Sequence, residues 1–243
     1  MTIFISTMSF AQNKDSIFSK EWQEIDSLIL KNNLPKTALE KVDAVYKKAQ
    51  AQHLPAEVIK ALIYRISLQN TVQETDANNE IIELSNEINK NDNAAAKAIL
   101  HSILAQKYVE IYNRDRWRIS QRSETILFKK EDVNTWSNKD FLNAINANFN
   151  TSLEPVMLLQ KISLNEFNAI IKAGNSRYLR PTLYDLLAHE ALNYYKNPIE
   201  PVTNPAFAFT LNDPVIFATA NEFAFHIFNS KDSTSSNLKA LKL

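Results

Sequence analysis

The chain has 243 residues, 45% hydrophobic and 22% charged, which suits a globular protein with a real core and argues against a disordered chain. Its 27 basic and 27 acidic side chains cancel, so the overall positive charge typical of nucleic-acid-binding proteins is missing. The chain has a single glycine, where average usage gives roughly 17, which argues against β-rich folds and excludes glycine-rich phosphate loops. It has no cysteine, which excludes disulfides and thiolate sites.

Residues 1–12 are predicted to be the remnant of a signal peptide. The apolar run Ile3-Phe4-Ile5 is followed by Ser9-Phe10-Ala11, which has small residues at the positions that a signal peptidase reads. The apolar run is short and no basic residue precedes it, so we expect the natural start to lie within a longer signal peptide. This interpretation predicts export to the periplasm or cell envelope; the alternative is a frayed N-terminal tail.

Residues 13–113 are predicted to form helices joined by short turns. Apolar residues recur three and four positions apart, and the pattern is interrupted before Pro35, before Pro55 and after Leu68. The alanine-rich stretch that begins at Asn93 predicts a central helix with neighbours on more than one side. The pattern therefore predicts an all-α, TPR-like (tetratricopeptide-like) array of antiparallel helix pairs, similar in architecture only, because the consensus glycines are missing.

Periodicity weakens after Arg114, and residues 114–139 are predicted to form one long irregular connecting loop with a short strand at Thr125–Phe128. Such a loop is usually functional or packed by its own aromatic residues. Residues 140–243 predict a second helical region, with helices at 140–149, 165–173 (ended by Gly174), 181–197, 213–228 and from 237, a broken helical segment at 152–164, and a short edge strand or extended loop at 206–211. The last apolar stripe ends after one turn, so we expect the chain to be the truncated front part of a longer protein.

The motif that most invites an enzymatic interpretation is His189-Glu190. A zinc-binding H-E-x-x-H motif needs a second histidine at the position of Asn193, so we predict instead a half-buried helix in which His189 bonds Asp185 or Glu190. The four histidines are far apart in the sequence, and His101 is predicted to be a satisfied core histidine. The residue pattern predicts no enzyme, no metal and no cofactor.

Arginines surround Trp117 in the predicted loop. Basic residues interleaved with an aromatic one could bind an anion or a single strand, but acidic residues lie close by, which favours a loop held by ion pairs and by a buried Trp117. The possible interaction surface comprises Arg114, Arg116, Trp117, Arg118, Tyr184, Tyr194 and Tyr195. The phenylalanine-rich end of the chain is predicted to be core, or alternatively a docking face for a following domain.

Several segments, taken in order, carry a resemblance to a known family. They are Trp22…Ile25-Asp26-Ser27-Leu28, Leu34-Pro35-Lys36-Thr37-Ala38-Leu39-Glu40, Ile59-Lys60-Ala61-Leu62-Ile63-Tyr64-Arg65, Ala96-Lys97-Ala98-Ile99-Leu100-His101-Ser102, Asn113…Arg116-Trp117-Arg118-Ile119 and Pro181-Thr182-Leu183-Tyr184-Asp185-Leu186-Leu187-Ala188-His189. Together they resemble the N-terminal helical region of large bacterial alpha-2-macroglobulin-like proteins, from Asp15 to the end of the chain.

That resemblance implies a non-catalytic interaction or scaffold module in a protease-trapping envelope protein. Its partners would be the following macroglobulin-type domains or another envelope protein, with no nucleic acid and no membrane span. The family's cysteine-containing thioester cannot be transferred to this chain, which has no cysteine. The alternative is a free-standing periplasmic TPR-like protein that binds peptides or proteins in a groove lined by exposed aromatics, with candidates Tyr108, Tyr112, Tyr184, Tyr194 and Tyr195. The sequence carries no indication of oligomeric state.

Overall fold

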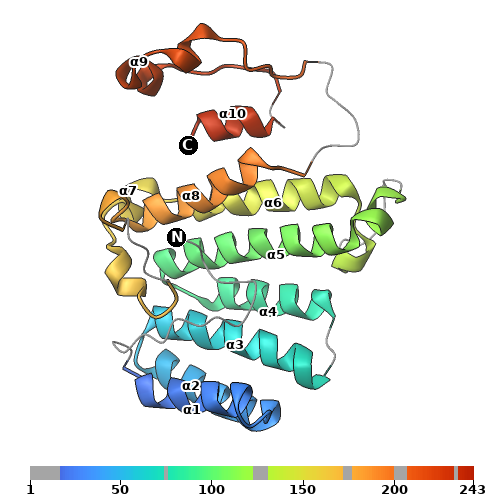
Figure 1. Ribbon diagram of the computed structural model, residues 1–243, viewed down its shortest axis with the longest axis vertical. Helices are drawn as coiled ribbons and strands as arrows, with labels where there is room; N and C mark the ends of the chain where they lie inside the picture. The colour runs from blue at the N-terminus through green and yellow to red at the C-terminus, as the bar shows by residue number, and fades with distance from the viewer. Residues whose placement is uncertain (1–16, 74–75, 123–130, 172–176, 200–206, 233–234) are drawn as a thin grey trace.

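The computed structural model describes residues 17–73, 76–122, 131–171, 177–199, 207–232 and 235–243 (Figure 1). The regular secondary structure of these residues is helical, as the sequence predicts, with no named strand among them. An isolated antiparallel bridge joins Ser163 to Thr182. The predicted signal-peptide remnant, the predicted strand at Thr125–Phe128 and Gly174 lie outside the described residues.

The N-terminal helices are α1 (Ser19–Leu30), α2 (Pro35–Ala51), α3 (Pro55–Gln73) and α4 (Ala77–Lys90). Pro35 and Pro55 stand at the first helical positions, where a missing backbone N–H costs nothing and the fixed φ suits a helix. Consecutive helices are connected by a few residues and lie side by side, stacked with roughly parallel axes (Figure 1). The expected breaks before these prolines are confirmed.

Helix α3 is buried on two faces. Val58, Ala61, Tyr64 and Leu68 pack with α1 and α2 in one hydrophobic cluster. The residues between them (Ile59, Leu62 and Ile66) pack with α4, α5 and the C-terminal helices in a second cluster. Both sets follow steps of three and four residues, which place each set along its own side of a helix. α3 therefore joins two cores into one array.

Helix α5 (Ala94–Ser120) is the central helix, as its alanine content predicts. It contacts α3, α4, α6 (Asn138–Ser152) and α8 (Leu183–Lys196). Ala96, Ala98 and Ala105 are fully or almost fully buried, so neighbouring helices approach closely on several sides. Its 27 residues give a length of about 40 Å at 1.5 Å per residue.

The second half of the chain is less regular than the first. It comprises α7 (Val156–Leu159), α9 (Ala220–Phe225), α10 (Ser236–Leu241) and the 3-10 turns η1 (Val133–Thr135), η2 (Leu164–Phe167), η3 (Arg177–Leu179) and η4 (Pro214–Phe217). Leu238 of α10 is buried, and α10 packs on α8. The η4–α9 segment forms an arm beyond α10 (Figure 1).

Two predictions for this half are wrong in the described residues. The helix expected over 165–173 is only the η2 turn, because the backbone of Leu164 bonds Pro181 and that of Leu183 bonds Ile162, which ties this segment to the start of α8. The helix expected over 213–228 is split, because Thr219 caps α9 separately from η4. Of the two alternatives for 206–211, an edge strand or an extended loop, the described residues 207–211 show the loop.

The phenylalanine-rich end is not the predicted core. Phe207, Phe217 and Phe225 are between 68% and 88% exposed, whereas Phe228 is buried. The reason is that α9 has six residues and makes its main contacts with η4 and Phe228, so it is too short to form a core with them.

Candidate interaction surface at the end of α5

The segment predicted to begin the long loop at Arg114 is helical. α5 continues to Ser120, and Gln121 is its C-cap residue. The segment contains no glycine or proline to stop the helix, and Ile119 is 1% exposed, which anchors the last turn in the core. The boundary at 114 is therefore wrong: the regular apolar pattern ends there, but one buried isoleucine holds the helix for two further turns.

The last two turns of α5 place their side chains on opposite sides. Ile111, Tyr112 and Ile119 face the core, whereas Arg114, Arg116, Trp117 and Arg118 are exposed. At about 100° per residue, Trp117 points almost directly away from the core, with Arg114 next to it one turn earlier. Trp117 is 80% exposed, so the predicted buried Trp117 is wrong. We refer to Arg114, Arg116, Trp117 and Arg118 as the Trp117 surface.

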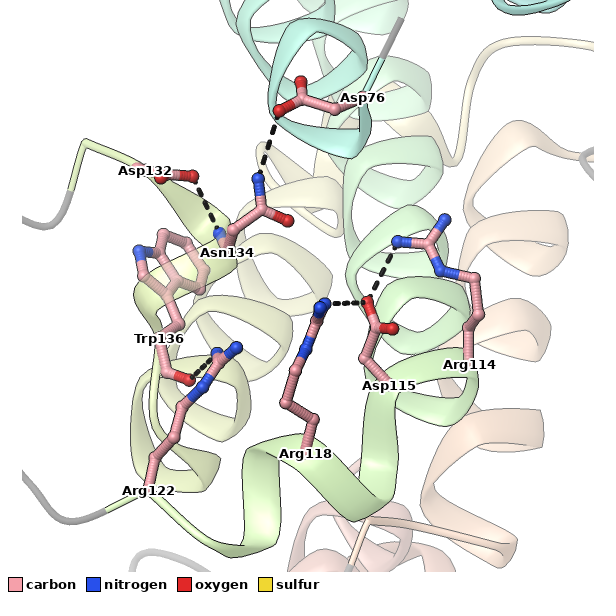
Figure 2. A network of polar contacts seen from close by, with 8 residues as sticks. All are labelled: Asp76, Arg114, Asp115, Arg118, Arg122, Asp132, Asn134 and Trp136. Carbon is pink, nitrogen blue, oxygen red and sulfur yellow. Dashed lines mark hydrogen bonds and ion pairs between the residues drawn. The ribbon is translucent and has the colours of Figure 1, made fainter. Parts of the chain in front are cut away.

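Asp115 holds two of these arginines. The Nη2 atoms of Arg114 and Arg118 lie 3.0 and 3.1 Å from the same oxygen, Oδ2 of Asp115 (Figure 2). Partial burial alone would raise the pKa of the Asp115 carboxyl, but the hydrogen bonds and charges of both arginines outweigh it and lower that pKa. The predicted ion pairs are thus present, and they hold the guanidinium groups of Arg114 and Arg118 at Asp115, on the same two turns of α5 that carry the exposed Trp117.

The described end of the α5–α6 connection is packed by an aromatic residue, but by Trp136 rather than Trp117. The Trp136 ring lies 5.1 Å from that of Tyr108 and 5.3 Å from that of Phe141. Nη1 of Arg122 donates to the Trp136 carbonyl oxygen at 2.8 Å, which joins the end of α5 to the start of α6 (Figure 2).

The η1 turn connects this region to α4. Asp132 caps η1 by accepting a hydrogen bond from the Asn134 backbone, and Nδ2 of Asn134 donates to Asp76, the N-cap residue of α4 (Figure 2). The Val133 backbone donates to Asn78. Hydrogen bonds between η1 and α4 therefore hold this region in place.

A sequence signal for this arrangement exists in Trp136-Ser137-Asn138-Lys139-Asp140-Phe141. The Ser137 side chain accepts a hydrogen bond from the Asp140 backbone, and the Asp140 side chain accepts one from the Ser137 backbone, which completes a capping box at the start of α6. Trp136 precedes the cap and meets Phe141, which is the hydrophobic staple that often accompanies such a box. The sequence-based prediction of a helix that begins at Asp140 did not include this capping signal.

The predicted tyrosines do not join the Trp117 surface. Tyr194 and Tyr195 are 8% and 2% exposed and belong to the core, stacked near Phe149. Tyr108 and Tyr112 are also buried, so these four do not line an open groove. Tyr184 is half-buried at the start of α8, which lies beside α7, whereas α5 ends at the opposite side of the array (Figure 1). The structure brings together only the α5 members of the predicted surface.

His101 and His189 have structural partners. Nδ1 of His101 lies 2.8 Å from Oδ1 of Asn148, so this half-buried histidine is satisfied as predicted. Nε2 of His189 lies 3.0 Å from Nη1 of Arg180, not from Asp185 or Glu190. Burial and the positive charge of Arg180 lower the pKa of His189, which favours a neutral ring that accepts this hydrogen bond. Among the residues that the structure describes, His, Asp and Glu side chains do not gather in a group that could hold a metal ion.

No family model, curated protein or solved structure matches the chain. None of the described helices combines the length and the apolar character that crossing a membrane requires.

Proposed function

We propose that this protein is a non-catalytic helical interaction module that contacts another protein through the Trp117 surface. The observation that carries the proposal is the exposure of Trp117, 80%, on a regular helix whose neighbouring arginines are held by Asp115. Tryptophan and arginine are the side chains most enriched among residues that dominate binding energy at protein interfaces. A rigid helix also lowers the entropy cost of forming such a contact.

The arrangement of helices supports a scaffold role. Helix–turn–helix stacking of α1 to α6 is compatible with a TPR-like array, in which helix pairs hold a binding surface in place. The ordered resemblance from Trp22 to His189 supports a place in an alpha-2-macroglobulin-like envelope protein, where this module would be accessory to protease trapping. Export to the periplasm or envelope belongs to the same proposal.

Photo-crosslinking in the source cells tests the interaction. A photoreactive phenylalanine analogue replaces Gln121, which is exposed and one helical turn beyond Trp117; the control carries it at Lys47, exposed on α2. We expect a discrete cross-linked protein from position 121 that is missing from position 47. Equal labelling at both positions, or none at 121, would refute the proposal.

Immunoblotting of the native protein separates the macroglobulin interpretation from a free-standing binder. A band several times larger than 27.8 kDa supports a module within a large envelope protein. A band at or just below 27.8 kDa supports an independent peptide- or protein-binding protein and removes the macroglobulin interpretation.

A further inference from the structure

The donor arrangement of the Trp117 surface indicates which partner chemistry it fits. A guanidinium group carries five N–H donors in a planar fork. The described contacts of Arg114 and Arg118 to Asp115 use one nitrogen of each, and both side chains remain more than half exposed, at 55% and 60%. Most of their donors therefore face solvent in a fixed orientation.

Charge and apolar character occur together on this surface. Arg114, Arg116 and Arg118 outnumber Asp115, so the end of α5 is locally positive in a chain with no net charge. Trp117, one helical turn from Arg114, offers a flat apolar face beside these donors. The complementary ligand has carboxylates close to an apolar side chain.

We infer that the Trp117 surface binds an acidic protein segment, with its carboxylates on Arg114 and Arg118 and an apolar side chain on the Trp117 indole. This inference rests on the proposed function and names the partner's chemistry. An acidic peptide fits better than a nucleic acid, because single-strand binding stacks successive bases on several aromatic residues along a basic groove. Here the α5 end carries one exposed indole, and a carboxylate already pairs with two of its arginines.

The test uses defined peptides and the NMR signals of the tryptophan indole N–H groups. One short peptide has glutamates on both sides of a leucine, and its partner has glutamines in place of the glutamates. The indole of Trp22 donates to Glu57 in the core, and Trp136 packs on Tyr108 and Phe141, so only the Trp117 signal should shift. The other two signals also report that the fold is intact.

We expect the glutamate peptide, and not the glutamine peptide, to shift the Trp117 signal, with weaker binding at higher salt. Trp117→Ala, followed through the backbone amides of α5, and Arg114→Gln with Arg118→Gln should each weaken binding at least about tenfold. The matched control Lys47→Gln removes an exposed positive charge on α2 and should leave the affinity unchanged.

Equal binding of both peptides, or tighter binding of a single-stranded oligonucleotide than of the glutamate peptide, would overturn the inference. If neither peptide binds while position 121 still cross-links a protein in cells, the acidic-segment inference is wrong and the interaction proposal stands. Loss of the position-121 cross-link itself would refute the interaction proposal.

Discussion

Positively charged side chains differ in burial and in pairing between the two parts of α5. In the buried part, Lys107 pairs with Glu80 of α4 at 2.7 Å, and the two side chains are only 13% and 10% exposed. Burial opposes the charge on Lys107, but its contacts with Glu80 and Glu110 outweigh that cost and raise its pKa. In the last two turns, Arg114 and Arg118 are mostly exposed and share Asp115 within the same helix.

The difference shows where the array ends and the Trp117 surface begins. Up to Tyr112, neighbouring helices surround α5, and even a charged side chain must find a partner on another helix. Beyond Tyr112 only Ile119 faces the core, and the other side chains are exposed or partly exposed. The first part should therefore govern stability, and the second should govern contacts with a partner.

The largest effect is expected in the buried part. Ile103 is 2% exposed, so Ile103→Asp buries an unpaired charge, which costs several kcal/mol against a total stability of about 5–15 kcal/mol. We expect loss of the helical circular dichroism signal. The control Ile103→Val should cost about 1 kcal/mol in urea unfolding. A folded Ile103→Asp protein would contradict the central position of α5.

The next effect concerns the buried ion pair. Glu80→Ala leaves Lys107 with only the more exposed Glu110, and we expect a loss of about 3 kcal/mol in the free energy of unfolding. Glu110→Ala removes the exposed partner and should cost less than about 1 kcal/mol. Replacing Glu80 and Lys107 together by leucine should restore part of the loss, and a double variant less stable than Glu80→Ala would argue against this explanation.

A smaller effect is expected at the helix cap beside the Trp117 surface. Ser137→Ala removes the capping box of α6 and should cost about 1 kcal/mol, measured by urea unfolding. Thr219→Ala removes the same type of box from α9, whose main element contact is the short η4 turn, and should change the global unfolding free energy by less than about 0.5 kcal/mol. Similar losses in both variants would mean that the η4–α9 arm unfolds together with the array.

The smallest effect is the pH dependence from His189, outside α5. Its pKa is lowered in the folded protein, so the unfolded chain binds more protons below its own value of about 6.5. The contribution of His189 to the free energy of unfolding is fully present above about pH 6.5 and is lost as the pH falls below that value. His189→Gln keeps an acceptor for Arg180 and removes the titration, so its unfolding free energy should fall less steeply. If the unfolding free energies of the parent and of His189→Gln fell equally steeply with pH, the assignment of this pH dependence to His189 would be contradicted.

Sequence patterns predicted the array better than its surface. Apolar periodicity and prolines located α1 to α5, because burial is periodic along a helix and proline marks its start. Periodicity did not show where α5 ends, since Ile119 alone anchors its last turn. Nor could it distinguish Trp117 from Trp136: both lie among charged residues, and only the cap at Ser137 shows which one packs inward.

The second half was harder to predict because its segments depend on distant partners. The backbone bonds between Ile162, Leu164, Pro181 and Leu183 join segments that no local pattern connects. Tyr194 and Tyr195 could be named as aromatic candidates, but their burial against Phe149 follows from the packing of α6 on α8.

The most direct test of the account is Trp117→Ala combined with the photoreactive residue at position 121. Tyr178→Ala serves as the matched control, since Tyr178 is 79% exposed on η3, away from α5 in the sequence. We predict that Trp117→Ala abolishes the cross-linked protein while its unfolding free energy stays within about 0.5 kcal/mol of the parent, and that Tyr178→Ala changes neither. An unchanged cross-link in Trp117→Ala, or an unfolded variant, would contradict the claim that α5 ends in a contact surface that the fold does not need.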